Sequence, residues 1–217
     1  FVEHSANEIL ENDTIEIKIN IFEGKKLLVE KINIRGNNVT DEAVIRSELL
    51  LDEGDPFNSL KLDQSIARIK GRNLFGEVKK TVTSGSSVDQ KIIDIFVEEK
   101  PTGEISAGAG VGTNGASFAF NVSENNWLGK GLRINTSIDV GKETFSGGFS
   151  MSDPNYNFSG NTLTFHATNT TNDKKDSGYK NKIFSSGVGV VFEQYQDIHL
   201  SPSLIFCTEF KSYVVVV

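Results

Sequence analysis

The sequence predicts an α+β module followed by a run of antiparallel β-strands. Two observations lead to this prediction. Apolar residues before Pro101 recur at both strand-like and helix-like intervals, whereas after Gly103 they recur at every second position. Composition changes at the same place, since 19 of the 29 acidic residues but only 6 of the 20 glycines fall in the first hundred positions. We therefore place a domain boundary at Pro101–Gly103.

Composition also excludes several classes of protein. A net charge of −7 argues against a nucleic-acid partner, because phosphate binding requires a basic surface. No apolar run approaches the ~18–20 residues of a membrane-spanning helix. Cys207 is the single cysteine, and His4, His166 and His199 lack ligand-type spacing, so we expect no internal disulfide, metal or cofactor. No leader-like segment precedes Phe1, and we expect an internal fragment or a matured product.

The first module begins with a strand and a helix. Leu27–Arg35 alternates between apolar and polar residues, which predicts a strand. After a Gly-Asn-Asn break, Thr40 is the expected helix N-cap, and two acidic residues follow in the first turn, where the helix dipole favours negative charge. The helix is expected to end at Gly54-Asp55-Pro56. Its apolar stripe consists of Ala43, Val44, Ile45, Leu49 and Leu50.

A second helix and a hairpin complete the module. Asn58 or Ser59 is expected to cap the helix, whose apolar stripe consists of Leu62, Ile66 and Ile69. Val78–Val82 and Ile92–Val97 are expected to form a hairpin across a polar loop. The order of elements in this module is therefore β-α-α-β-β.

A weaker signal precedes this module. Ile21–Lys25 echoes Phe96–Lys100, 75 residues later, because both are strand ends followed by a charged exit. The simplest interpretation makes residues 1–24 the tail of one module and residues 27–100 the whole of the next. A single echo leaves this repeat open on pattern alone.

The second half consists of alternating segments. The first expected strand is Glu104–Gly112, followed by a tight turn at Thr113-Asn114, and a longer polar turn is expected at Asn169–Asn181. The other expected strands are Ser117–Ser123, Leu132–Val140, Phe145–Met151, Leu163–Ala167, Phe184–Phe192 and Ile198–Phe206. Alternating segments of about ten residues are typical of a transmembrane β-barrel. A soluble sandwich with its apolar face inward shows the same alternation, so the pattern leaves both open.

Several motifs resemble one family of proteins. In the first module these are Ile34-Arg35-Gly36-Asn37, Gly54-Asp55-Pro56-Phe57 and Asn73-Leu74-Phe75-Gly76. They resemble POTRA domains, the periplasmic repeats of the Omp85 family. In the second half, Asn125-Asn126-Trp127-Leu128-Gly129-Lys130-Gly131 resembles the turn after the second barrel strand of these proteins. Ser152-Asp153-Pro154-Asn155-Tyr156 resembles the segment after their fourth strand.

The resemblance implies three parts. Residues 1–24 would be the tail of a preceding POTRA domain, residues 25–101 a POTRA domain, and residues 102–217 the first strands of an outer-membrane β-barrel. The implied location is the bacterial outer membrane, with the POTRA domain in the periplasm. The family's barrel has more strands than this chain, so we expect the barrel to be incomplete and the function to belong to a longer parent protein.

The implied function is the assembly and insertion of outer-membrane proteins, with no catalytic residues. Unfolded clients would pair with an exposed POTRA edge strand by β-augmentation. The edge strand in this chain would consist of Val78, Lys79, Lys80, Thr81 and Val82.

The first barrel strand would form one lip of a lateral gate. A glycine-rich lip would make few side-chain contacts and would therefore open easily. Its glycines are Gly108, Gly110 and Gly112. Client hairpins could then pair with its free N–H and C=O groups, which are costly to leave bare in lipid.

Two further residues gain roles through the resemblance. Glu48 falls where the family carries an acidic contact to an accessory lipoprotein; a solvated helix charge is the alternative. Trp127 would anchor the barrel at the membrane–water interface, where indole rings concentrate, and a buried core Trp is the alternative.

Other functions are weighed against this one. Gly110-Val111-Gly112-Thr113-Asn114-Gly115 spells G-x-G-x-x-G, but an alternating strand follows instead of the helix that a nucleotide site needs. No Ser/His/Asp group or carboxylate pair has a catalytic arrangement, so we expect no enzyme. The alternative function within the family is a secretion or translocation pore. The alternative outside it is a soluble all-β binding domain joined to an α/β module.

Overall fold

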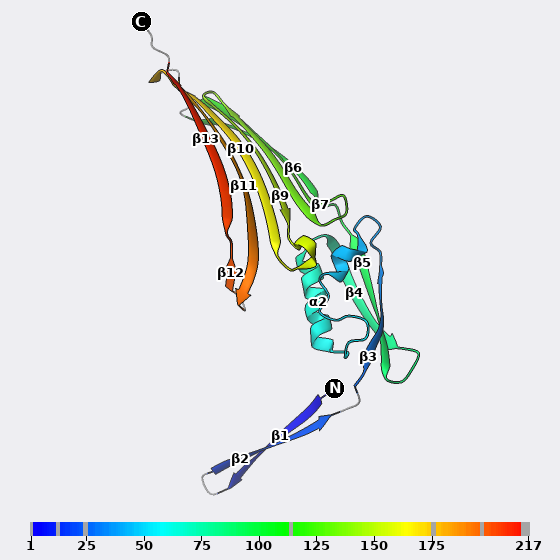
Figure 1. Ribbon diagram of the computed structural model, residues 1–217. Coiled ribbons are helices and arrows are strands. Elements are labelled where there is room, and N and C mark those ends of the chain that lie inside the picture. The colour runs from blue at the N-terminus through cyan, green and yellow to red at the C-terminus, as the bar shows by residue number, and fades with distance from the viewer. Residues whose placement is uncertain are drawn as a thin grey trace. The chain divides into compact units, whose positions relative to one another are not determined.

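The computed structural model describes residues 2–11, 14–23, 26–112, 115–174, 177–195 and 198–213. The chain forms two compact units (Figure 1). One unit comprises Phe1–Asn37 and Glu48–Glu98, and the other comprises Asn38–Ser47 and Glu99–Val217. Within the described ranges, no helix is both long and apolar enough to cross a membrane.

A three-stranded sheet is the centre of the first unit. Its strands are β3 (Leu28–Arg35), β4 (Phe75–Ser84) and β5 (Gln90–Glu99), in the spatial order β3-β5-β4. β3 runs parallel to β5, and two helices and β4 lie between them in the chain. This β-α-α-β-β order confirms the predicted fold class of the module. β5 is central, so β3 and β4 are both edge strands of this sheet.

The longer helix packs its predicted stripe into the core. This helix, α2 (Ser59–Gly71), contacts β4, and Leu62, Ile66 and Ile69 on its inner face are all buried. The most deeply buried sheet residues are Val29, Ile32, Ile93, Ile95 and Val97. Burying each such side chain contributes about 1.5–3 kcal/mol.

The two helix starts differ in how well the sequence predicts them. Asn58 caps α2 as predicted, because its side-chain oxygen accepts the N–H groups of Leu60 and Lys61. The first helix, α1 (Glu42–Arg46), is capped by Asp41, so the prediction of Thr40 as its cap is wrong by one residue. The Thr40 side chain instead accepts a hydrogen bond from Asn126.

The first helix is also much shorter than predicted. It ends at Arg46 and not at Gly54, and the chain beyond it is tied to α2. Leu50 donates its N–H to the Ser65 hydroxyl at 2.8 Å, and Leu51 is buried. The apolar residues after Arg46 are thus accommodated in a non-helical segment.

An antiparallel hairpin precedes the module. β1 (Val2–Glu11) and β2 (Thr14–Glu23) pair along their whole length, from Val2 opposite Glu23 to Glu11 opposite Thr14. A hairpin is what the last two strands of another β-α-α-β-β copy would form. The assignment of residues 1–24 to a preceding copy stays a prediction, and Gly24 and Lys25 of the echo lie outside the described residues.

The second unit is dominated by one large antiparallel sheet. Its spatial order is β12-β11-β10-β9-β8-β7-β6, and β13 also pairs with β11. A short 3-10 helix, η1 (Tyr156–Phe158), connects β9 to β10. The sheet is not closed, and β6 forms one of its edges. The strands are β6 (Gly103–Gly112), β7 (Gly115–Trp127), β8 (Leu132–Gly141), β9 (Thr144–Asp153), β10 (Thr162–Lys174), β11 (Tyr179–Tyr195), β12 (Ile198–Leu200) and β13 (Ser203–Tyr213).

Most of these strands are longer than the sequence predicts. The expected polar turn at Asn169–Asn181 is wrong, because β10 continues to Lys174 and β11 begins at Tyr179. An ion pair between Lys180 and Asp173, opposite each other on the two strands, stabilises this extension. The expected tight turn at Thr113-Asn114 lies outside the described residues.

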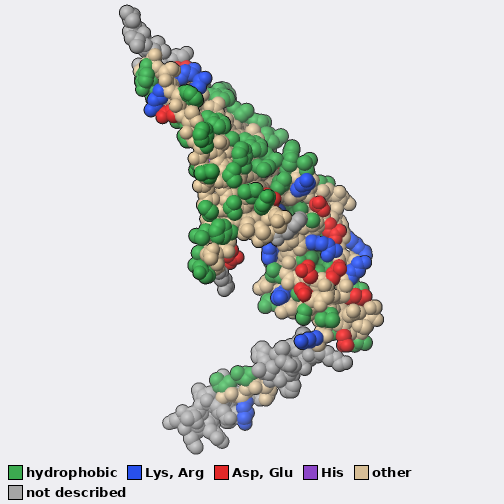
Figure 2. Space-filling model, in the orientation of Figure 1, with side chains coloured by type: hydrophobic (Ala, Val, Ile, Leu, Met, Phe, Trp, Pro, Cys, Tyr) green, Lys and Arg blue, Asp and Glu red, His purple; other side chains and the backbone are tan. Residues whose placement is uncertain are grey.

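The register gives the sheet one apolar and one polar face. Paired residues of antiparallel strands share a face. Figure 2 shows hydrophobic side chains gathered over this sheet. One register row on the apolar face contains Ala109, Phe118, Val140, Phe145, Thr171, Lys182 and Phe210. The neighbouring row on the polar face contains Gly108, Ala119, Asp139, Ser146, Thr170, Ile183 and Glu209.

The apolar face is largely uncovered. Phe118 is 61% exposed and Phe206 is 64% exposed. A soluble sheet buries such a continuous apolar surface, whereas a barrel in lipid presents it outward. The faces of the second unit therefore match the strands of a membrane barrel better than those of a soluble sandwich.

Candidate functional site

The first strand of the large sheet has an open edge. β6 is hydrogen-bonded to β7 on one side, and all ten of its residues are exposed. Gly108, Gly110 and Gly112 alternate along it and lie on the polar face. A Cβ added at Gly108 or Gly112 would meet no atom within 4 Å. Neither packing nor backbone φ therefore requires these glycines, and what they provide is a strand with few side-chain contacts.

Trp127 ends β7 at a tight turn. Its side chain is 46% exposed, so it is not a core residue, and its role as an interface anchor stays a prediction. Asn126 closes this turn, because its side-chain oxygen accepts the Gly131 N–H at 2.8 Å. Leu128 follows with a positive φ of 55° and is also exposed.

A carboxylate holds the segment that precedes α1. The side chain of Glu99 accepts the backbone N–H groups of Asn38 at 3.0 Å, Val39 at 2.9 Å and Thr40 at 2.6 Å. Burial alone would raise the pKa of this carboxyl, but hydrogen bonds from the Thr40 side chain and from these three N–H groups outweigh it. The pKa of Glu99 is therefore lowered from its ordinary value of 4.5.

The turn after β7 binds the same segment. Asn126 donates its side-chain N–H to the Thr40 hydroxyl at 2.9 Å, and Asp41 donates its N–H to the Gly129 carbonyl at 2.8 Å. Gly129 has a φ of +72°, and a Cβ there would lie 2.1 Å from the Val39 carbonyl oxygen. Only glycine fits this position. We call this arrangement the Glu99 clasp: Glu99, Asn38–Asp41 and the turn Asn126–Gly129.

All residues of the Glu99 clasp belong to the second unit. Sequence reasoning identified the turn as a motif but assigned it no intramolecular partner. The sequence signal for this contact was the spacing of Asn126 and Gly129. A side-chain amide followed three residues later by glycine indicates a tight turn that another backbone segment can approach.

The predicted client-binding strand lies within β4. Its first residue, Val78, is buried, while the other four residues of this segment are exposed. Lys80 forms an ion pair with Asp63 on α2, and Lys79 lies 2.8 Å from Glu77. The segment is at a sheet edge, as β-augmentation requires, and its role in client binding stays a prediction.

Glu48 has a different environment from the one predicted for a surface charge. Its side chain is only 9% exposed, with its oxygens 3.1 Å from Arg68 Nε and 3.6 Å from Arg72 Nη1. The alternative of a solvated helix charge is therefore wrong. The predicted contact with a partner stays a prediction, and the group that reaches the surface here is the half-exposed Arg68.

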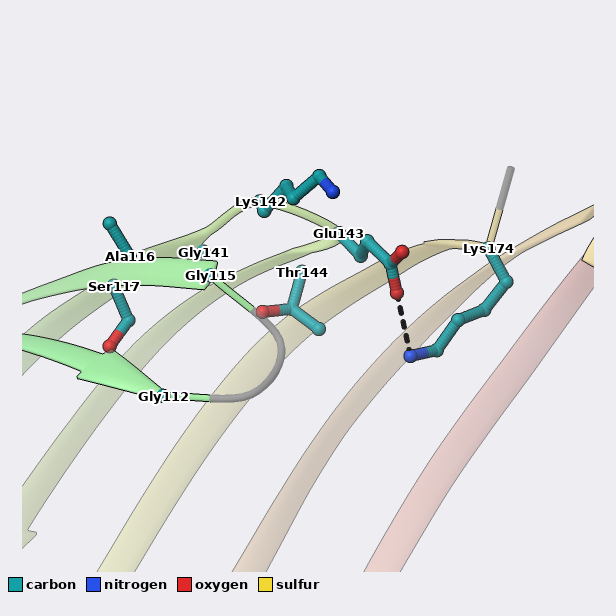
Figure 3. Close-up of a pocket in the computed structure, with 9 residues that line it drawn as sticks. All are labelled: Gly112, Gly115, Ala116, Ser117, Gly141, Lys142, Glu143, Thr144 and Lys174. Atoms are coloured by element: carbon teal, nitrogen blue, oxygen red, sulfur yellow. Dashed lines mark hydrogen bonds and ion pairs between the residues drawn. The ribbon is translucent and has the colours of Figure 1, made fainter. Parts of the chain in front are cut away.

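A recess of about 300 Å³ lies where the β6–β7 and β8–β9 hairpins meet β10 (Figure 3). Lys174 donates to the Glu143 carboxylate at 2.8 Å, which lowers the pKa of that carboxyl. The recess is lined by Gly112 and Gly115 of the G-x-G-x-x-G run, but the strand β7 begins at Gly115. A phosphate site at a helix N-terminus therefore cannot form here.

Among the described residues, no three His, Cys, Asp or Glu side chains lie close enough to hold one metal ion. Cys207 is exposed and unpaired. The candidate site is a surface, formed by the apolar sheet face and the edge strand β6.

Residues 27–100 match the POTRA family, described as a surface antigen variable number repeat. The chain is 30% identical over 206 residues to the outer membrane protein assembly factor BamA of Neorickettsia risticii. The aligned region covers 90% of this chain and 27% of that protein. It therefore spans about a quarter of that relative's length.

Two solved structures resemble the fold. BamA from Haemophilus ducreyi lacking POTRA domains 1–3 aligns with 99% of this chain and 42% of that structure, at a TM-score of 0.75 and 20% identity. CdiB from Escherichia coli aligns with 97% of this chain and 42% of that structure, at a TM-score of 0.63 and 13% identity. These likenesses concern the fold alone.

A POTRA domain followed by the antiparallel strands of a partial barrel defines the class of outer-membrane β-barrel proteins with POTRA repeats. Within that class, the chain belongs to the Omp85 family and is BamA-like.

Proposed function

We propose that the protein containing this chain assembles and inserts outer-membrane proteins. The observation that supports this most strongly is an open edge strand next to an exposed apolar face, β6 beside β7, in a chain similar to BamA. Such a strand can pair with another strand at membrane depth, and no bond-making chemistry is needed. The protein would lie in the outer membrane, with its POTRA domain in the periplasm.

β6 would act as one lip of a lateral gate. Its backbone N–H and C=O groups on the open side need partners, because each unsatisfied group costs several kcal/mol in lipid. A client strand can supply these partners. The absence of side chains at Gly108, Gly110 and Gly112 keeps lateral contacts few, so exchange between the closing strand and a client strand would require little rearrangement.

β4 would bind clients before they reach the barrel. It offers an exposed strand edge, and Lys79 and Lys80 make such an edge polar enough to remain soluble. An extended client segment would add to this edge by main-chain hydrogen bonds, which tolerate many sequences. This mode suits a protein with many different clients.

An accessory lipoprotein would bind near α2. We propose that Glu48 acts indirectly, by holding Arg68 and Arg72 in fixed positions, and that Arg68 makes the contact. Removing Glu48 would then withdraw the carboxylate that positions Arg68, since a broken buried pair leaves an uncompensated charge.

A secretion or translocation pore is the second candidate, because it is the alternative function that the resemblance to the Omp85 family implies. The two functions differ in where the client ends: within the membrane for an insertion factor, and on its far side for a pore.

The gate is tested by locking β6 to the closing strand of the full-length protein with an engineered disulfide, in a Cys207→Ser background. We expect the locked protein to lose insertion of an unfolded client barrel into proteoliposomes and to regain it on reduction. Each single-cysteine variant is the control. Undiminished insertion with the disulfide formed would show that β6 is not a gate.

A further inference from the structure

Two lysines lie at one end of the mainly apolar face of the large sheet. Lys182 pairs in register with Thr171 and Phe210, and Phe184 follows it on the same face. Lys180 shares that face, two residues earlier on β11, so the two Cα atoms are about 7 Å apart. This end of the apolar face thus carries two cations, with the Asp173 carboxylate opposite Lys180.

The position of this pair along the strands is fixed by the topology. Lys180 and Lys182 follow the turn between β10 and β11, on the same end of the sheet as the β6–β7 and β8–β9 hairpins. Gly103, where β6 begins, is at the opposite end. In a barrel whose POTRA domain is periplasmic, the lysine end is the one nearest the outer leaflet.

The two lysines differ in whether an acidic side chain compensates their charge. Lys180 Nζ lies 3.1 Å from the Asp173 carboxylate, so its charge is partly compensated. Lys182 is exposed, and among the described residues no ion pair involves it. A cation on a lipid-facing surface without a partner favours an anionic one.

A recess of about 440 Å³ lies beside these lysines and is lined by Lys180, Lys182, Phe210, Lys211 and Ser212. Phe210 is 67% exposed. The recess therefore offers apolar contact next to positive charge. This arrangement is complementary to a lipid, in which an acyl chain lies next to a negatively charged phosphate group.

We propose that Lys182, assisted by Lys180, binds the phosphate group of an anionic lipid, with Phe210 and Phe184 against its acyl chain. The ligand is a membrane lipid and not a free phosphate ion, because the two lysines lie on the apolar face. This inference rests on the proposed outer-membrane location.

The test uses the full-length protein in phosphatidylcholine vesicles containing increasing fractions of phosphatidylglycerol, with a spin label on the phosphatidylglycerol. Motionally restricted lipid measures binding at the protein surface. One lysine near an anionic surface changes lipid affinity about fivefold, so we expect Lys182→Ser to lower the relative affinity for phosphatidylglycerol by about that factor. Lys182→Arg should keep it.

Arg133→Ser is the matched control, because it removes one positive charge from the polar face of β8. It should leave the affinity unchanged, and excess inorganic phosphate should not displace the lipid. An unchanged affinity in Lys182→Ser, an equal loss in Arg133→Ser, or displacement by inorganic phosphate would each overturn the lipid site.

Failure of the proposed location gives a different result from failure of the lipid site. If the wild-type protein does not insert into these vesicles and restricts no lipid of either kind, the membrane location is wrong. If it inserts and restricts both lipids without the predicted dependence on Lys182, only the lipid site is wrong.

Discussion

Replacing Glu99 by glutamine should release the segment that precedes α1. Glu99 accepts three backbone N–H groups, from Asn38, Val39 and Thr40. A hydrogen bond to an ionised acceptor contributes about 1.5–3 kcal/mol and is roughly twice as strong as a neutral one. The carboxylate is only half-buried, so we take the low end and expect Glu99→Gln to lower the local opening free energy by about 1–2 kcal/mol.

Hydrogen–deuterium exchange of the full-length protein measures this change. A loss of about 1–2 kcal/mol corresponds to roughly 5–30-fold faster exchange, which we expect at the amides of Val39 and Thr40. Glu98→Gln is the control, because Glu98 is the exposed neighbour on the same strand. Unchanged exchange in Glu99→Gln, or equal acceleration in Glu98→Gln, would refute the Glu99 clasp.

Acid should have the same effect on the wild-type protein. The folded-state pKa of Glu99 is lowered, so its stabilisation is fully present above the ordinary value of 4.5 and is lost as pH falls below it. Protection of Val39 and Thr40, corrected for intrinsic exchange, should therefore decline in that acidic range. Glu99→Gln should show no such decline. If this variant keeps the pH dependence of the wild-type protein, another group and not Glu99 causes that dependence.

Two further substitutions test packing. Gly129→Ala places a methyl group 2.1 Å from the Val39 carbonyl oxygen at a positive φ, so we expect hydrogen exchange at the Asp41 amide to accelerate. Gly108→Ala is the control, because its methyl group meets no atom within 4 Å, and it should leave this exchange unchanged. Equal behaviour of the two variants would contradict the packing described. Ile69→Ala empties a fully buried position on α2 and should lower the free energy of unfolding of the POTRA domain by about 2–5 kcal/mol in urea titrations of the full-length protein, while a loss under 1 kcal/mol would show that the core is not packed as described.

The strands and the second helix could be predicted because their signals are local. Alternation over Leu132–Val140 depends only on which face each residue takes, and β8 occupies that segment with one added residue. The capping role of Asn58 depends only on the N–H groups two and three residues later, and Asn58 caps α2 as expected. Periodicity and capping are contained within a few positions of the chain.

The parts that the sequence did not predict depend on distant partners. Thr40 has the residue type of an N-cap, but Asp41 takes that role while Thr40 binds Asn126, 86 residues away. Glu48 was expected to contact a partner or to be a solvated charge, but Arg68 on α2 and Arg72 at its C-terminal end enclose the carboxylate. The extension of β10 past Asn169 depends on its pairing with β11, which includes the Asp173–Lys180 ion pair and which polarity alone does not reveal.

The most direct test of the proposed function follows the fate of a client. An unfolded outer-membrane protein is added to vesicles containing the full-length protein, and its folded, membrane-embedded fraction is compared with that in empty vesicles. We predict faster appearance of folded client within the bilayer, with none released into the vesicle lumen. Client recovered in the lumen would contradict an insertion factor and would identify a translocation pore.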